Sequence, residues 1–244
     1  MQRIDAEGIH YRELNDRINQ AVREGEQEFI LDNIRGQRYI GAGLGNPVRI
    51  TINGTAGADL ASFMDGAEIT VNGNAQAGVA NTMNSGKIVI HGDAGDIMGY
   101  SMRGGGLFVR GSVGYRAGIH MKAYQDRMPR VVIGGSAGDY LGEYMAGGVL
   151  VVLGLDADDA CPLGEYAGTG MHGGTIFVRG EPRPWQLGAE VGQPEIDDED
   201  WQQLHALLEE FCAEFDLDPS GFGREEFTKM IPVSERPYGR LYAY

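Results

Sequence analysis

Few residues in this 244-residue chain have the types and spacing that catalysis or metal binding requires. The five histidines show no HxH or HxxxH spacing, and no Ser–His–Asp or Cys–His arrangement can be argued from the sequence. The two cysteines, Cys161 and Cys212, form neither a metal-binding motif nor a disulfide framework, which is typical of a reducing compartment. We therefore predict no catalytic residue, no metal site and no cofactor bound by this chain. We interpret each histidine as a surface or corner residue: His10, His91, His120, His172 and His205.

Two short clusters resemble ligand-binding loops but lack the necessary spacing. Gly41, Gly43 and Gly45 lie in GAGLGNP, which has no third glycine at the dinucleotide-binding distance and opens no helix. We interpret them as a structural turn. Asp156, Asp158 and Asp159 lack the glycine turn and the closing Glu of a calcium loop.

The chain is organised instead by a phrase that returns seven times between residues 50 and 180. Each copy ends on a glycine, at spacings of 19, 19, 19, 24, 19 and 26 residues: Gly54, Gly73, Gly92, Gly111, Gly135, Gly154 and Gly180. The residues two and four positions before each glycine are all aliphatic, from Ile50 and Ile52 to Ile176 and Val178. Side chains two apart on a strand point the same way, so these fourteen should fill one interior.

A period of 19 residues suits one turn of a β-solenoid. Five methionines lie nine residues before their glycines, and Met121 joins their column once a five-residue insertion is allowed for. Glycines at the following corner indicate tight bends. The predicted fold is all-β, a right-handed parallel β-helix of about seven 19-residue turns.

The flanks should close the ends of this solenoid. An amphipathic pattern predicts a short helix over residues 11–24, and a broader apolar stripe predicts a second over 199–215. Because solenoid ends expose unpaired strand edges, we expect short helical caps at both ends. The predicted segments are an N-terminal helix and cap (1–45), a repeat domain (46–180) and an acidic C-terminal helix and tail (181–244).

An outward strip of apolar side chains should be covered by something. It lies between the two inward ladders, and its cover could be either the chain's own C-terminal helix or a partner subunit. The strip consists of Val89, Phe108, Val132, Val151 and Phe177. A second copy of the chain could also stack on it, which makes a homo-oligomer one possible assembly.

Two insertions interrupt the regular wall, and projecting loops of a rigid scaffold commonly carry function. The first, within residues 122–130, is polar and basic; the second, within 155–169, is acidic. Either could be a tolerated excursion or a contact site. With the strip residues, we take these as docking candidates: Lys122, Arg127, Arg130, Asp156 and Asp158.

Charge and composition exclude several classes of partner. The net charge of −15 argues against nucleic acid and anionic membranes. No apolar run approaches the roughly 20 residues of a membrane-spanning helix, and the start has no apolar signal core. We therefore expect a cytoplasmic protein.

The repeated phrases NGTAG, HGDAGDIMGYSMRGG and GTGMHGGTIFVRG resemble the GXGXG domain. That domain is the C-terminal β-helix of the glutamate synthase large subunit, and it also forms one of the subunits of formylmethanofuran dehydrogenases. The resemblance spans residues 54–180, and its M-x-G-G and G-x-A-G corners make it specific. It implies a β-helix without catalysis of its own.

The resemblance also implies partners. In a split glutamate synthase-like complex, this chain would position a class II glutamine amidotransferase-like subunit and an FMN/iron–sulfur synthase-like subunit. FMN and the iron–sulfur cluster would then lie on those partners. The alternatives are a scaffold of a formylmethanofuran dehydrogenase-type oxidoreductase and an independent polysaccharide-active β-helix enzyme. The latter would need outward clusters of charge along a groove, and the outward ladder is mostly uncharged.

Overall fold

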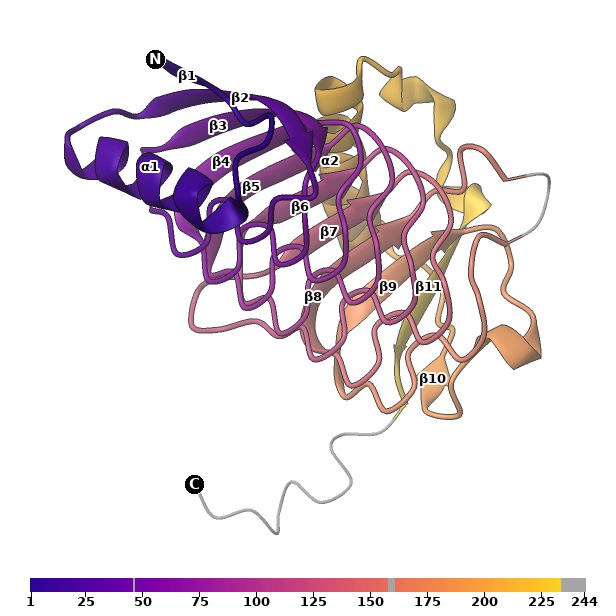
Figure 1. Ribbon diagram of the computed structural model, residues 1–244. Helices are drawn as coiled ribbons and strands as arrows, with labels where there is room; N and C mark the ends of the chain where they lie inside the picture. Colours follow the sequence, from indigo (N-terminus) through magenta and orange to yellow (C-terminus); the bar gives the residue numbers. More distant parts are fainter. Residues whose placement is uncertain (46, 158–160, 234–244) are drawn as a thin grey trace, which may run out of the picture.

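The computed structural model describes residues 1–45, 47–157 and 161–233 as one parallel β-solenoid with two helices (Figure 1). One long strand from each turn joins a single sheet, in which sequential strands are neighbours through β9. The strands are β1 (Gln2–Asp5), β2 (Glu28–Arg35), β3 (Arg49–Thr55), β4 (Asp65–Asn72), β5 (Ser85–Ile90), β6 (Gly106–Val109), β7 (Arg130–Ile133), β8 (Ala146–Val152), β9 (Gly173–Arg179), β10 (Val191–Gly192) and β11 (Phe227–Pro232). The helices are α1 (Tyr11–Arg23) and α2 (Asp198–Phe215), with short 3-10 turns at Pro184–Gln186, Pro219–Gly221 and Arg224–Glu226.

The predicted interior ladders are confirmed. All fourteen inward positions are at most 2% exposed. The strand register stacks like positions, as in the pairing of Ile50 with Ile69 and of Ile52 with Val71. Because the seven strands β3–β9 enclose six complete turns, the solenoid has about six turns, slightly fewer than predicted. Burial of each aliphatic side chain contributes on the order of 1.5–3 kcal/mol before entropy is subtracted.

The terminal glycines lie where successive turns come closest together. A Cβ on Gly92 would be 2.8 Å from the backbone oxygen of Gly73, and a Cβ on Gly111 would be 2.9 Å from that of Gly92. These separations are too short for a real Cβ atom. Each terminal glycine therefore supports the next, which is why the residue recurs at this position in every turn.

Polar side chains beside these glycines tie the turns together. Asn74 Oδ1 accepts a hydrogen bond from the Asp93 amide at 3.0 Å. Asp93 Oδ1 accepts from the Ser112 amide at 2.8 Å, and Ser112 Oγ accepts from the Ser136 amide at 3.0 Å. The short polar residue after each of these glycines thus satisfies a backbone donor of the following turn.

The corner glycines seat the methionine column. The Met64 methyl would lie 3.0 Å from a Cβ on Gly86, and the Met121 methyl 3.0 Å from a Cβ on Gly148. The six methionines of the column are all at most 2% exposed. The M-x-G-G corners therefore combine a flexible apolar filler with the space that it needs.

The wall opposite the strands is an arc with a regular left-handed backbone. Three alternate positions in each of seven turns have positive φ, and many of these residues are not glycine. They are Tyr39, Asp59, Gly78, Ile97, Arg116, Tyr140 and Tyr166 in the first column; Gly41, Ala61, Ala80, Gly99, Gly118, Gly142 and Gly168 in the second; and Gly43, Phe63, Thr82, Ser101, His120, Tyr144 and Gly170 in the third. Each non-glycine residue costs about 1–3 kcal/mol there unless its surroundings impose the conformation.

Hydrogen bonds between turns impose it. Amides of the second column donate to the preceding turn, as from Ala80 to Leu60 O at 2.9 Å. Amides of the first and third columns donate to the following turn, as from Asp59 to Ala77 O at 2.9 Å. The arc is therefore a second hydrogen-bonded ladder, and the strain of each turn is held by its neighbours.

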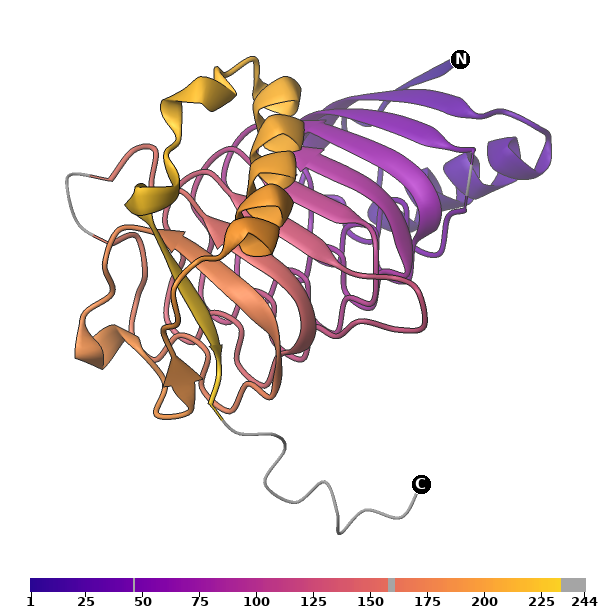
Figure 2. The ribbon, with the colours of Figure 1, turned by 180° about the vertical axis from the view of Figure 1, so that it is seen from behind.

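The two ends are closed differently. At the N-terminus, β1 and β2 extend the parallel sheet beyond the predicted repeat, and α1 buries Leu14, Ile18 and Ala21 against the solenoid interior. At the C-terminus, β11 pairs antiparallel with β9, so a strand rather than a helix covers that edge. The helix α2 instead crosses the outer face of the sheet (Figure 2). The predicted C-terminal helical cap is wrong in this respect. Neither helix of the described ranges combines the length and the hydrophobicity that crossing a membrane requires.

Replacing Gly54 with Ala should test the close approach of the turns. Gly54 has φ +130°, and an added Cβ would lie 3.0 Å from the Ile34 carbonyl carbon. Steric overlap and backbone strain together should lower the free energy of unfolding by about 2–5 kcal/mol. Urea unfolding would measure this. Gly221→Ala, which adds a Cβ with nothing within 4 Å, is the control and should change little.

Candidate docking surfaces

The outward apolar strip is covered by the chain's own C-terminal helix. Its five residues, Val89, Phe108, Val132, Val151 and Phe177, are at most 2% exposed. They form one cluster with Leu204, Leu208 and Phe211 of α2. Of the two predicted covers, the structure therefore shows the helix, and these five residues are not free to dock a partner or a second copy. Their designation as docking residues is corrected on this ground.

Ion pairs hold α2 in place around this cluster. Arg130 donates to Glu210 at 2.6 Å and Lys87 pairs with Glu214. Lys229 of β11 reaches Asp200 at 2.6 Å, with both side chains about 15% exposed. Partly buried pairs of this kind are screened less than surface pairs. Arg130, predicted as a docking residue, thus serves to anchor α2.

The first insertion is a short hairpin, Lys122–Arg130, between β6 and β7. Reciprocal backbone hydrogen bonds of 3.0 Å between Tyr124 and Arg127 close its tip. The hairpin runs back along the neighbouring turns, where Arg127 pairs with Asp65 at 3.2 Å (Figure 1). Tyr124 is 46% and Met128 47% exposed, and Lys122 is also exposed. The hairpin therefore presents apolar side chains from a backbone that is anchored at both ends.

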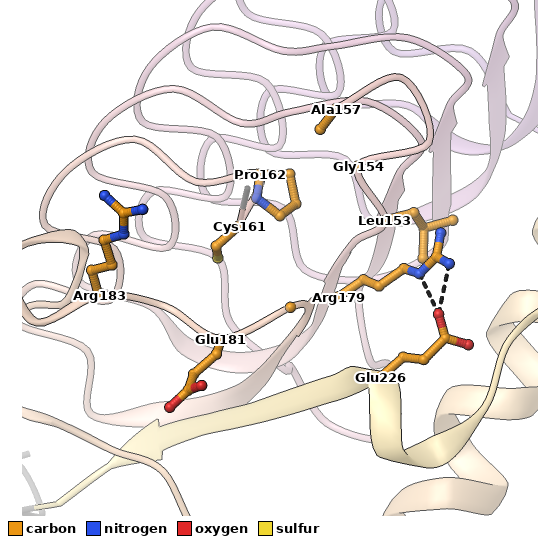
Figure 3. Close-up of a pocket in the computed structure, with 10 residues that line it drawn as sticks. Leu153, Gly154, Ala157, Cys161, Pro162, Arg179, Glu181, Arg183 and Glu226 are labelled. Atoms are coloured by element: carbon orange, nitrogen blue, oxygen red, sulfur yellow. Dashed lines mark hydrogen bonds and ion pairs between the residues drawn. The ribbon is translucent and has the colours of Figure 1, made fainter. Parts of the chain in front are cut away.

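The second insertion borders a pocket of about 450 Å³ next to the last turn (Figure 3). Asp156 pairs with Arg110 at 3.5 Å, whereas Asp158 lies outside the described residues. Burial raises the pKa of the Cys161 thiol to about 11, so Cys161 is a protonated thiol at neutral pH and a poor nucleophile. Across the pocket, Arg179 makes two contacts with Glu226, at 2.7 and 2.6 Å.

Six exposed or half-exposed rings on the arc form a surface that the sequence did not single out. This aromatic face consists of Tyr100, Tyr115, His120, Tyr140, Tyr144 and Tyr166. The His120 ring stacks on Tyr144 with centroids 5.3 Å apart, and Tyr140 stacks on Tyr166 at 5.4 Å. His120 and Tyr144 each precede a methionine of the column, and this register was the signal available in the sequence.

A buried ion pair joins the two halves of the aromatic face. Arg116 lies over the rings of Tyr115 and Tyr140, 5.5 and 5.4 Å from their centroids. Its Nε is 2.8 Å from Glu143 Oε2, and Glu143 is only 8% exposed. Because Glu143 directly precedes Tyr144, this pair fixes the first arc column against the third.

The comparison with protein families decides what kind of chain this is. The model of the GXGXG motif family matches residues 28–232. The chain belongs to this family. A protein of Methanocaldococcus jannaschii named "Uncharacterized protein MJ1350" is 46% identical over 248 residues, which covers 98% of this chain and 95% of the relative.

The glycine cluster that the sequence offered as a turn now has a place in the GXGXG fold. Gly41, Gly43 and Gly45 lie on the arc of the first turn, with φ of +73° at Gly41 and +69° at Gly43. A Cβ on Gly41 would collide with the Ile69 side chain of the interior. These glycines therefore meet the demands of the arc.

Metal-ligating side chains do not gather in the described part of this GXGXG chain. There, no group of three or more His, Cys, Asp or Glu residues is placed to hold an ion. The surfaces that the fold presents are instead the hairpin, the aromatic face and the pocket beside β11.

The contact between Arg179 and Glu226 should make stability depend on pH. Burial opposes ionisation of Glu226, but hydrogen bonds from the Gly223 amide and from Arg179 outweigh it, so the pKa of Glu226 lies below its ordinary value. A folded-state pKa below the unfolded value stabilises the fold above about pH 4.3, and the contribution is lost as the pH falls through the folded pKa.

Glu226→Gln should therefore lower the free energy of unfolding by about 1 kcal/mol at pH 7, with a smaller loss at pH 4. Denaturant unfolding at both pH values measures the difference. Glu181→Gln is the control, because Glu181 lines the same pocket without an ion pair to any described residue. An equal loss at both pH values for Glu226→Gln would contradict the assignment.

Proposed function

We propose that this GXGXG-family chain is a non-catalytic docking subunit of a split glutamate synthase-like complex. Its partners would be a class II glutamine amidotransferase-like subunit and an FMN/iron–sulfur synthase-like subunit. The catalytic residues, FMN and the iron–sulfur cluster would belong to those partners. Family membership over residues 28–232 supports this proposal, together with the resemblance of the repeats to the β-helix of glutamate synthase.

The observation that carries the docking role is the anchored hairpin Lys122–Arg130. Tyr124 and Met128 are nearly half exposed, although the pairs Arg127–Asp65 and Arg130–Glu210 fix the backbone beneath them. A loop held in one conformation loses little entropy on binding. Tyrosine and methionine are enriched in the buried centres of protein interfaces. The hairpin is therefore built to be buried by a partner.

The solenoid suits this role because its surface is rigid. Each turn is bonded to its neighbours through the strand ladder and through the arc. A partner that contacts the hairpin is thereby placed at a fixed position relative to the strands and to α2. Holding two partners in a fixed relation is the contribution that a subunit without catalytic groups can make.

Co-purification with candidate partners from the source organism tests this proposal. We expect the wild-type chain to retain an amidotransferase-like or FMN-dependent subunit, and glutamine-dependent glutamate formation to require the assembled mixture. Tyr124→Ser combined with Met128→Ser should weaken retention of a partner at least about ten-fold. Trp185→Ser removes a ring that is 51% exposed elsewhere and should have no effect.

Two outcomes would contradict the proposal. Recovery of no amidotransferase-like or FMN-dependent subunit would count against the complex. Recovery of molybdopterin or tungsten subunits instead would assign the chain to a formylmethanofuran dehydrogenase-type assembly.

A further inference from the structure

The described chain ends beside the aromatic face. The Val233 amide donates to the Glu190 carbonyl at 2.9 Å. The Glu190 carboxylate accepts from the Gly170 amide at 3.2 Å, and a Cβ on Gly170 would lie 2.5 Å from the Tyr144 ring. The Tyr144 ring thus covers Gly170, one contact from Glu190. Residues 234–244 therefore start next to the aromatic face.

Their length is sufficient to cross it. Eleven residues follow Val233, and an extended chain spans at most about 3.3–3.6 Å per residue, or roughly 36–40 Å. The aromatic face occupies four successive turns, from Tyr100 to Tyr166. At about 4.8 Å per turn, this is roughly 14 Å.

The terminal sequence has the chemistry that the aromatic face would bind. In SERPYGRLYAY, every second residue from Arg236 to Tyr244 is Arg or Tyr. In an extended segment, these five side chains would share one side. The position of Arg116 between two tyrosine rings shows that this surface holds a guanidinium by stacking.

Charge favours the same pairing. Residues 234–244 contain two arginines and one glutamate, a net charge of +1, so the rest of the chain carries −16 and the whole chain −15. Asp139 and Glu165 are exposed beside Tyr140 and Tyr166. The basic end of an acidic chain therefore starts next to a surface that is bordered by carboxylates.

We propose that residues 234–244 bind in an extended conformation on the aromatic face of the same chain. Attachment at Val233 gives the segment a high effective concentration there. Two copies of a chain with a net charge of −15 repel each other, which disfavours exchange of the segment between copies. The inference does not depend on the proposed function.

Photo-crosslinking of the full chain tests it. A benzoylphenylalanine in place of Tyr242 should crosslink, within the monomer, to peptides that carry Tyr100, His120, Tyr144 or Tyr166. Tyr144→Asn with Tyr166→Asn should reduce the yield at least about five-fold, as for loss of interface anchors. Asparagine is chosen because both positions have positive φ, which it tolerates.

Tyr39→Asn is the matched control, because Tyr39 is an exposed arc tyrosine at φ +61° outside the aromatic face. It should leave the yield unchanged, and all variants should keep the wild-type melting temperature. The proposal is overturned by crosslinks to other regions, by crosslinks only between two copies, or by a yield that the double substitution does not change.

Discussion

The backbone of each turn lies directly on the backbone of the turn before it, and this close contact constrains the rest of the molecule. At the ends of the strands the approach leaves no room for a Cβ, so glycine recurs there. At the methionine corner a second glycine accepts the methyl group of the preceding turn. On the arc, alternate residues take positive φ so that their amides can reach the turns above and below. Loss of one of these contacts would weaken its neighbours, because each turn shapes the next.

The same constraint explains where function can reside in this family member. The interior is filled by aliphatic and methionine side chains, and the sheet face from β5 to β9 is occupied by α2. What remains are side chains that project from columns, and the two insertions that leave them. Because the columns are rigid, rings from separate turns stand in contact, as His120 and Tyr144 do. A surface of this kind can hold another segment or subunit without changing shape.

Much of the fold could be predicted from the sequence because its signals are periodic. The alternation of Ile50 and Ile52 predicts a strand, its return every 19 residues predicts a solenoid, and the stripe from Leu204 to Phe211 predicts α2. The arc could not be predicted, because its first column contains Tyr39, Asp59, Gly78 and Ile97, which share no residue type. The closing strand β11 was equally hidden, since antiparallel pairing with β9 depends on the path taken by the chain between them.

The docking residues were harder to place than the fold. An outward apolar strip has the same sequence pattern whether a helix of the same chain or a partner covers it, and only the position of α2 decides. Arg127 and Arg130 looked like free basic groups, but each is paired with a carboxylate far away in sequence. The aromatic face is spread over turns about 24–26 residues apart, so that its members meet only in the folded chain.

Native-state hydrogen exchange would test the stacked-turn account most directly. The amides of Ala80 and Gly99 on the arc donate to the preceding turn, and those of Ile90 and Val109 lie in strands of the same turns. If both walls are one continuous ladder, all four amides should exchange only through global unfolding, with the same free energy of opening. Exchange of Ala80 and Gly99 by local opening, orders of magnitude faster than the strand amides, would contradict the account.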